Sequence, residues 1–422
     1  MRSGNGTSLV IPAAHSSWQG LRGLLALVSS VVFVETLFFT AITPLLPHYV
    51  STLHLTKSGA GILVAAYPFG TLLFALPGGA FASRAGVKTA VVAGLVLMSA
   101  ATLVFGFGRT EVVVDVARFA QGVGGSLIWA GALGWLAAAA PPDRRAAALG
   151  VSFGAAVSGA LFGPALGAIA SRLGTGPTFA AATVAGACLV VASLAVPARG
   201  GKETPVAGQV LLALREVRFG AGLWLTFMAG LAFGTVDVLA PLRLSRLGAG
   251  AFVIGATFLA AAGVEAASAP VIGRVADHRG RRLPLTLSVA AGIAVSAVLP
   301  LAAPATVLVV VLVAGLPAYG SMYVPAAALV SDGAQRRQLH QGLAFGFSNL
   351  AWAGGQAAAA AGSGALAQAA GDTLPYAILG AGFAATLVAL SPPGRRLVSR
   401  LMVRAGTCPG ALTARRRVTG AR

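Results

Sequence analysis

The chain has 422 residues, of which 57% are hydrophobic and only 10% are charged. A soluble protein of this length carries about 25% charged residues, so the composition excludes a large soluble domain. The net charge of +19 lies in short basic clusters between apolar runs. That distribution argues against a nucleic-acid-binding protein and fits loops held on the cytoplasmic face of a membrane.

Uncharged apolar stretches of about 20 residues, the length that crosses a bilayer as a helix, recur along the whole chain. We therefore predict an all-α membrane protein with twelve spans. In chain order they cover residues 22–47, 58–82, 87–107, 111–139, 146–171, 177–197, 219–245, 250–273, 284–302, 305–331, 341–367 and 374–391.

Arginine is concentrated in alternate loops and in both tails, which places both termini in the cytoplasm of a multi-pass cell-membrane protein. The longest interior polar stretch, residues 198–218, separates six spans from six. The predicted organisation is a cytoplasmic tail (1–21), a six-helix bundle (22–197), a central cytoplasmic loop (198–218), a second six-helix bundle (219–391) and a basic cytoplasmic tail (392–422). The predicted outer loops carry few basic residues: Lys57, Arg109, Arg172, Arg243 and Arg246.

An internal repeat supports this division. When residue 61 is aligned with residue 255 without gaps, glycines and alanines of the first half fall on identical residues in the second. The matches end in the same inter-span loop of each half. Parallel halves of six spans around a central path are a transporter architecture.

The loop after span 8 contains Gly273, Asp277, Gly280, Arg281 and Arg282 at a spacing that resembles the loop signature of the major facilitator superfamily. Glycine permits a tight turn, aspartate can pair with arginine or cap a helix, and the basic residues anchor the loop to the cytoplasmic side. The resemblance implies a part in the cytoplasmic gate. A topology anchor without a gating role is the alternative.

The first-half copy of this loop keeps Gly79, Arg84, Gly86 and Lys88, but Ser83 replaces the aspartate. If these loops form the cytoplasmic gate, the ionic contact that closes it is therefore expected to depend on Asp277 in the second copy.

Span 4 contains Arg118 and Gln121, followed by glycine, which resembles the family's signature in the fourth helix. An arginine inside a span is costly, faces the protein interior and needs a partner. Asp115 lies three residues earlier on the same helix face. The pattern fits either a structural ion pair or, as the resemblance implies, an element of proton coupling.

Span 5 carries helix-breaking residues at regular intervals and resembles the family's antiporter motif, with Ala168 where the family has a second glycine. The matching residues are Gly150, Gly159, Gly163, Pro164 and Gly167. Small residues four apart let another helix approach closely. We expect this close contact at the seam between the two halves. A simple packing face is the alternative, and only the resemblance points to export.

Span 1 contains Pro44 and Pro47 near its outer end, as in the first helix of the drug/proton antiporter branch of the family. The resemblance covers nearly the whole chain. It implies the major facilitator fold, with two pseudo-symmetric six-helix bundles.

Few ionisable residues lie inside the predicted spans, and each must face a cavity, pair or be protonated. They are Glu35, Asp115, Arg118, Asp237 and Glu265. Spans 1, 4, 7 and 10 line the cavity in this family, so Glu35 and Asp237 are the first candidates for proton coupling or substrate binding. Glu265 is central in span 8. Each acid can instead be a buried structural group.

Aromatic residues in the same four spans are candidates for the wall of an apolar, cation-tolerant pocket. They are Phe38, Phe39, Trp129, Trp224, Tyr319 and Tyr323. Each taken alone also fits plain packing or an interfacial anchor.

These features predict a secondary transporter that exports a small amphipathic or drug-like molecule by alternating access. The resemblance implies the antiporter direction. We expect a proton gradient as energy source, no cofactor, no metal and no enzymatic activity. The expected partners are the lipid bilayer, the small-molecule substrate and protons, and the protein is expected to be a monomer. A proton symporter that imports a metabolite and a non-transporting membrane sensor are the alternatives.

Overall fold

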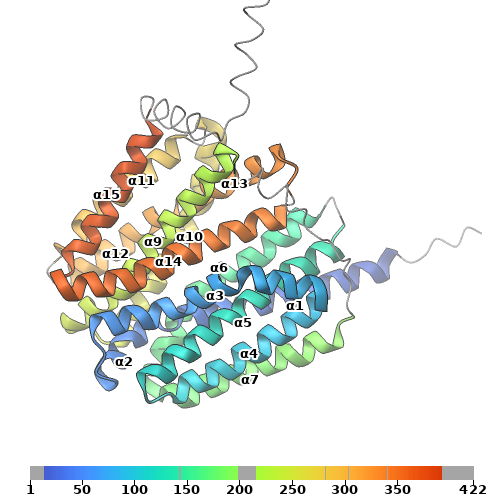
Figure 1. Cartoon of the computed structure of the whole chain (residues 1–422), viewed down its shortest axis with the longest axis horizontal. Helices are drawn as coiled ribbons and strands as arrows, with labels where there is room; N and C mark the ends of the chain where they lie inside the picture. The colour runs from blue at the N-terminus through green and yellow to red at the C-terminus, as the bar shows by residue number, and fades with distance from the viewer. Residues whose placement is uncertain are drawn as a thin grey trace, which may run out of the picture.

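The computed structural model describes residues 14–141, 144–197, 215–280, 282–302, 304–339 and 341–391, and their regular structure is helical throughout (Figure 1). The elements are α1 (Ala14–Thr40), η1 (Thr43–Leu45), α2 (Leu46–Thr52), α3 (Lys57–Ala85), α4 (Val87–Phe107), α5 (Glu111–Ala139), α6 (Arg145–Leu173), α7 (Thr175–Ala195), α9 (Val217–Arg246), α10 (Ala251–Arg279), α11 (Arg282–Val298), α12 (Ala305–Gly320), α13 (Tyr323–Arg336), α14 (Gln341–Ala370) and α15 (Thr373–Leu390).

These helices confirm the predicted all-α membrane protein. Ten helical segments of the described chain are long and apolar enough to cross a bilayer, and α11 is a shorter apolar helix. Two predicted spans are broken. The first divides into α1, η1 and α2 around Pro44, and the tenth divides into α12 and α13 soon after Pro317. Proline lacks an N–H and clashes with the preceding turn, which explains the first break.

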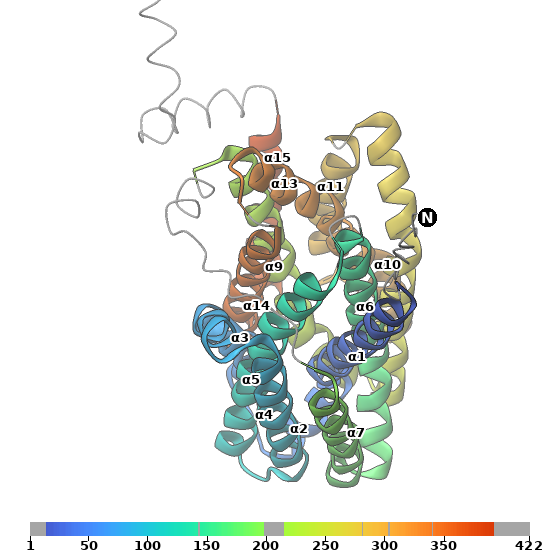
Figure 2. The same ribbon diagram turned by 90° about the vertical axis from the view of Figure 1, so that its right-hand side faces the viewer.

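The helices pack in two groups that follow the chain (Figures 1 and 2). The first group is α1 to α7, in which α5 packs against α3 and α4, and α1 against α6. The second is α9 to α15, in which α9 packs against α14 and α13. The main contacts between the groups are α3 with α14 and α6 with α10. The predicted linker lies largely outside the described residues, so its bounds stay predictions.

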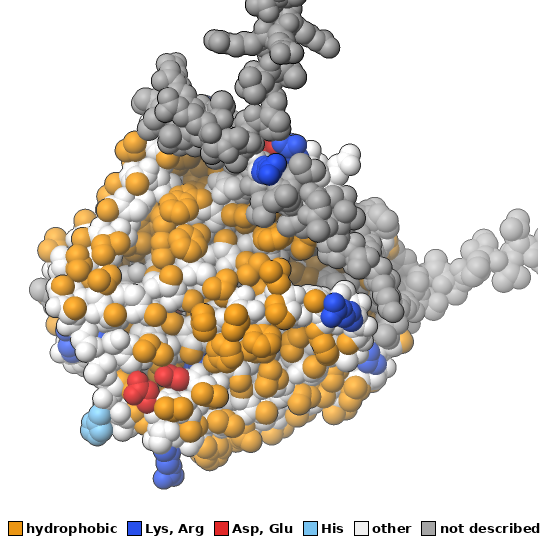
Figure 3. Space-filling view, in the orientation of Figure 1, with side chains coloured by type: hydrophobic (Ala, Val, Ile, Leu, Met, Phe, Trp, Pro, Cys, Tyr) orange, Lys and Arg blue, Asp and Glu red, His pale blue; other side chains and the backbone are white. Residues whose placement is uncertain are grey.

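Large apolar side chains are exposed along many helices, among them Leu76, Val112 and Leu173. Figure 3 shows a face covered by hydrophobic side chains, with the charged ones toward its edges. Contiguous apolar surface of this extent is unusual for a soluble monomer and fits contact with lipid.

The three central glycines of α6 pack against α1, not across the seam between the halves. A Cβ on Gly159 or Gly163 would collide with α1, and one on Gly167 would collide with Ala41 and Pro44 directly after α1. The expectation that these glycines form the inter-half seam is therefore wrong. A different face of α6 meets α10, where a Cβ on Gly255 would lie 2.9 Å from the Pro164 carbonyl and 3.0 Å from the Ala168 Cβ.

The proline in α6 is accommodated by α1. Because Pro164 has no N–H, the carbonyl of Ala160 lacks its helical hydrogen-bond partner. The hydroxyl of Thr40 on α1 donates to that carbonyl at 3.1 Å, and Thr36 one turn earlier donates to the carbonyl of Ala156 at 2.8 Å. The glycines let the two helices come close enough for these bonds to form.

Candidate functional site

Glu35 is buried in α1, and neutral donors hold both of its carboxylate oxygens. The hydroxyl of Tyr67 on α3 donates to Oε1, and the indole Nε1 of Trp129 on α5 donates to Oε2 at 2.9 Å. Gly125 leaves the room for this group, since a Cβ there would lie 2.5 Å from the Tyr67 hydroxyl and 2.8 Å from Glu35 Oε1. No ion pair to Glu35 occurs among the described residues. The carboxylate is thus hydrogen-bonded but has no paired cation.

Arg118 is also buried, and it binds the end of α1. Its guanidinium donates to the carbonyls of Phe38 (3.3 Å) and Phe39 (3.1 Å) and to Oε1 of Gln121 (3.0 Å), and it lies 5.0 Å from the centre of the Tyr67 ring. The last carbonyls of a helix lack helical partners and attract a cation. Arg118 therefore joins the broken end of the first span to α5.

The ion pair that the spacing of Asp115 and Arg118 allows does not form. The Arg118 guanidinium is engaged by carbonyls and by Gln121, and the buried Oδ1 of Asp115 has no hydrogen-bond partner among the described residues. The structural ion-pair interpretation of this motif is wrong. Gln121 in turn donates to the hydroxyl of Thr102 on α4 at 3.0 Å, which holds its amide toward Arg118.

Asp237 on α9 faces the first group. Nε2 of Gln356 on α14 donates to its Oδ2 at 3.0 Å, and Arg118 lies within electrostatic reach. Gly230 and Gly234 bring α9 onto the backbone of α14 next to Gln356. The Oε1 atom of Gln356 is buried without a partner in the described chain. A cation of the first group and an acid of the second are thus electrostatic neighbours.

Glu265 on α10 lies against the backbone of Gly320, where any Cβ would collide with the carboxylate. No described side chain donates a hydrogen bond to that carboxylate. Its charge and that of Asp237 both act on the hydroxyl of Tyr323, whose ring stacks on Phe233 with centroids 6.3 Å apart. The Tyr323 hydroxyl is therefore within electrostatic reach of both acids of the second group.

Three of the predicted aromatic residues lie in this region: Phe39, Trp129 and Tyr323. The ring of Phe39 is 4.7 Å from Tyr67 and 5.4 Å from Trp352 on α14, so it connects the two groups. The ring of Trp129 is 5.6 Å from Phe153 on α6.

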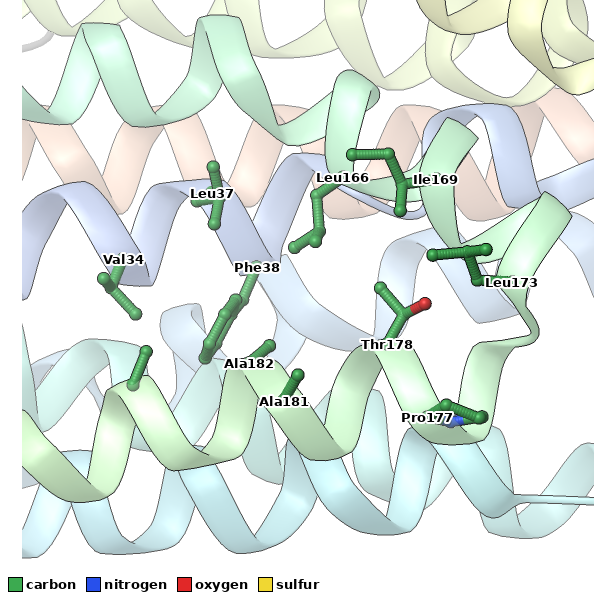
Figure 4. Close-up of a pocket in the computed structure, with 11 residues that line it drawn as sticks. Val34, Leu37, Phe38, Leu166, Ile169, Leu173, Pro177, Thr178, Ala181 and Ala182 are labelled. Atoms are coloured by element: carbon green, nitrogen blue, oxygen red, sulfur yellow. The ribbon is translucent and has the colours of Figure 1, made fainter.

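The other three aromatic residues lie elsewhere. Phe38 points into an apolar pocket of about 390 Å³ between α1, α6 and α7 (Figure 4). Trp224 is half exposed and donates to Thr386 on α15 at 3.1 Å. Tyr319 is buried, with its ring 5.5 Å from that of Phe383.

Tyr67, Gln356 and Trp352 belong to this region but were not among the sequence candidates. Neutral residues do not stand out by their charge. A glutamine such as Gln356 nevertheless costs free energy when it is buried in an apolar span, because its amide needs hydrogen-bond partners. Gly70 and Gly122 place Tyr67 beside Arg118, because they let α3 and α5 touch backbone to backbone.

The two predicted gate loops are tight turns. Gly86 (φ 97°) follows α3 and Gly280 (φ 81°) follows α10, a conformation that favours glycine. Lys88 donates to the carbonyls of Leu194 (2.8 Å) and Val196 (2.7 Å), within its own group. Gly79 and Gly273 have open space around them, so no close helix approach occurs there.

Of the remaining gate candidates, the two with described side chains make no described polar contact between the groups. Arg84 and Arg282 lie at the end of α3 and the start of α11. Asp277 is in α10, but its side chain lies outside the described part of the structure, as does the whole of Arg281. A gating role for these loops stays a prediction.

At the end of the bundle that the arginine distribution predicts to be outer, the two groups are joined by ions. Lys57 on α3 contacts Asp372 at 2.5 Å, and Arg246 on α9 contacts the other oxygen of Asp372. Burial alone would raise the pKa of Asp372, but the hydrogen bonds and charges of Lys57 and Arg246 outweigh it and lower that pKa. The backbone N–H of Ser58 also donates to Gln368 on α14 at 3.0 Å.

At the predicted cytoplasmic end, two ion pairs between described residues lie inside the second group: Arg218 with Asp332 (3.7 Å) and Arg337 with Glu216 (3.1 Å). Among the described residues, an aromatic contact crosses between the groups near this end. The ring of Phe153 on α6 lies 5.9 Å from that of Phe345 on α14.

Comparison with known proteins agrees with this architecture. Residues 28–360 match the profile of the family described as the Major Facilitator Superfamily. The chain is 28% identical over 191 residues to "Multidrug resistance protein 1" of Bacillus subtilis (44% of this chain, 48% of the relative). It is 29% identical over 136 residues to "Quinolone resistance protein NorA" of Staphylococcus aureus (32% and 35%). The matches therefore span half or less of these relatives.

A solved structure has the same fold. It is a bacterial homolog of the human lysosomal transporter Spinster in an inward-facing and unoccupied conformation, with a TM-score of 0.66 and 14% sequence identity. The likeness covers 90% of this chain and 95% of that one.

Proposed function

The chain belongs to the Major Facilitator Superfamily, and from this premise we propose that it exports a small amphipathic, drug-like molecule in exchange for protons. As a member it is a multi-pass membrane transporter. Two relatives carry names that refer to multidrug and quinolone resistance, which supports drug efflux. The glycine–proline pattern of α6 supports the antiport direction.

The observation that carries the proposal is the environment of Glu35. Its carboxylate is buried, held by two neutral donors and joined to no cation in the described chain. A buried acid without a cation gains and loses a proton with little rearrangement of its neighbours, whereas a salt-bridged acid must break its pair. Glu35 is therefore the first choice for the proton carrier.

Asp237 and Glu265 supply negative charge on the other side of the site. Asp237 has one oxygen held by Gln356, and Tyr323 and Phe233 provide aromatic faces close to it. Acids beside aromatic rings suit an amphipathic cation. Protonation of any of the three acids would shift the balance between outward- and inward-facing states, and substrate and proton would compete, as exchange requires.

The proton gradient is the proposed energy source, with no cofactor, and the protein is proposed to act as a monomer in the cell membrane with both termini cytoplasmic.

The test is flux of a cationic dye into inverted proteoliposomes that carry a pH gradient. We expect the parent protein to accumulate dye and Glu35→Gln to lose pH-driven accumulation while keeping its thermal stability. Asp332→Asn, which alters an acid away from the site, is the matched control. Unchanged pH-driven flux in Glu35→Gln would rule out Glu35 as the carrier, and no flux of any dye by the parent would count against drug export.

A further inference from the structure

Trp129 touches two parts of the molecule at once. Its indole N–H donates to Oε2 of Glu35 at 2.9 Å, and its ring lies 5.6 Å from that of Phe153 at an angle of 33°. One rigid side chain on α5 therefore contacts both the buried acid of α1 and an aromatic residue of α6.

Phe153 continues this contact into the second helix group. Its ring lies 5.9 Å from that of Phe345 on α14. Three glycines close to this pair in sequence are exposed and have room for a side chain. A Cβ on Gly150 or Gly154 of α6, or on Gly346 of α14, would meet no atom within 4 Å. The ring pair thus connects α6 of the first group with α14 of the second, and the nearby glycines leave room for labels.

The charged and titratable neighbours of Glu35 are few. Tyr67 on α3 bonds it directly, and Arg118 on α5 lies 5.0 Å from the Tyr67 ring. The described parts of α6 and α7, which also pack against α1, present no charged side chain to it. A change in the charge of Glu35 is therefore felt first by Tyr67 and Trp129.

We propose that Phe153 and Phe345 form the cytoplasmic gate and that Trp129 links the closure of this gate to the protonation of Glu35. An ionised carboxylate accepts a stronger and shorter hydrogen bond from an N–H than a protonated one does. Ionised Glu35 holds the indole in its present position against Phe153. Protonation loosens that bond, lets the indole move, and weakens the support of the ring pair. Trp129 acts here as a positioning residue.

This inference rests on the proposed role of Glu35, and its test needs neither substrate nor flux. Spin labels at Gly150→Cys and Gly346→Cys, where the space for a label is open, report the distance between α6 and α14 in nanodiscs. The native cysteines are replaced by serine. We expect the distance distribution to change between acid and alkaline pH in the parent protein and not in Glu35→Gln.

Trp129→Phe removes the N–H donor but keeps an aromatic ring beside Phe153. It is expected to abolish the pH-dependent change while leaving the gate able to close. Trp224→Phe, which loses an equivalent N–H bond to Thr386, is the matched control and keeps the change. Phe153→Leu is expected to broaden and lengthen the distances at every pH.

The outcomes separate the two proposals. A pH-dependent change that persists in Trp129→Phe, or its absence from the parent, overturns the link through Trp129. Distances unaffected by Phe153→Leu overturn the gate. If the distances follow the expected pH pattern while the parent protein moves no dye, that result supports the link through Trp129 and counts against drug export.

Discussion

The two ends of the bundle join the same pair of helix groups by different chemistry. At the predicted outer end, α3 and α14 touch backbone to backbone, and a Cβ on Gly364 would lie 3.0 Å from the Cα of Gly61. Lys57 and Asp372 add an ion pair across this contact. At the predicted cytoplasmic end, a ring pair, Phe153 with Phe345, crosses between the groups, and no backbone contact at glycine is described beside it.

This difference indicates which end opens more easily in the conformation seen here. Backbone contact at glycine has no side chain that can swing aside, so opening must separate whole helices. A ring pair can part by rotation of two side chains. The structure therefore resembles a state closed outside and poised to open inside.

The largest effect on stability and on closure of the outer end is expected from a substitution in the contact between α3 and α14. In Gly61→Val, the new side chain meets the carbonyl of Ala360 at the position of its Cβ (2.5 Å) and the backbone of Gly364. Overpacking of this kind costs about 3 kcal/mol. We expect a lower thermal unfolding midpoint and greater exposure of the outer end to impermeant thiol reagents. Gly263→Val, on α10 with open space around it, is the control. If Gly61→Val and Gly263→Val lower the unfolding midpoint and expose the outer end equally, the close contact at Gly61 does not hold that end closed.

A smaller effect is expected from the outer ion cluster. Asp372→Asn removes the acceptor shared by Lys57 and Arg246 and should weaken outer closure by about 2 kcal/mol. The pKa of Asp372 is lowered in the folded protein, so its stabilisation is present above the ordinary aspartate pKa of about 3.9 and is lost as pH falls through the lowered value.

The measurement for Asp372→Asn is the rate at which a cysteine at Ser58 reacts with an impermeant maleimide. At neutral pH this rate should be higher in the variant than in the parent. Asp332→Asn at the other end should leave it unchanged. An unchanged rate in Asp372→Asn would show that the ions do not hold this end closed.

The smallest effect is expected inside one group, where neither end is disturbed. Thr40→Ala leaves the Ala160 carbonyl beside Pro164 without its donor, at a cost of about 1 kcal/mol. A lowered unfolding midpoint with normal reactivity at both ends is the expected result. Thr52→Ala, an exposed threonine bonded only to its own helix, should change stability by less than about 0.5 kcal/mol. A Thr40→Ala variant that opens either end would show that α1 and α6 do not move as one unit.

Sequence alone found part of the candidate site. Glu35, Arg118 and Asp237 stood out because charge inside a span is costly, and the structure places Arg118 near Asp237 across the two groups. Tyr67, Gln356 and Phe153 did not stand out. Tyrosine and phenylalanine are common in apolar spans, and their importance comes from the neighbours that packing gives them.

The glycines of α6 show the same limit. Their spacing correctly indicated that another helix approaches closely, but spacing contains no information about which helix that is. The partner proved to be α1, and the seam with α10 uses Pro164 and Ala168.

The sequence by itself determined that this is an all-α, multi-pass membrane protein of a transporter family, because hydropathy, helix length and motif order are local properties of the chain. Only the tertiary structure decided which donors hold Glu35, where Arg118 finds its acceptors, and how the two ends differ. Those features depend on contacts between residues far apart in the sequence, and they are settled by the packing of whole helices.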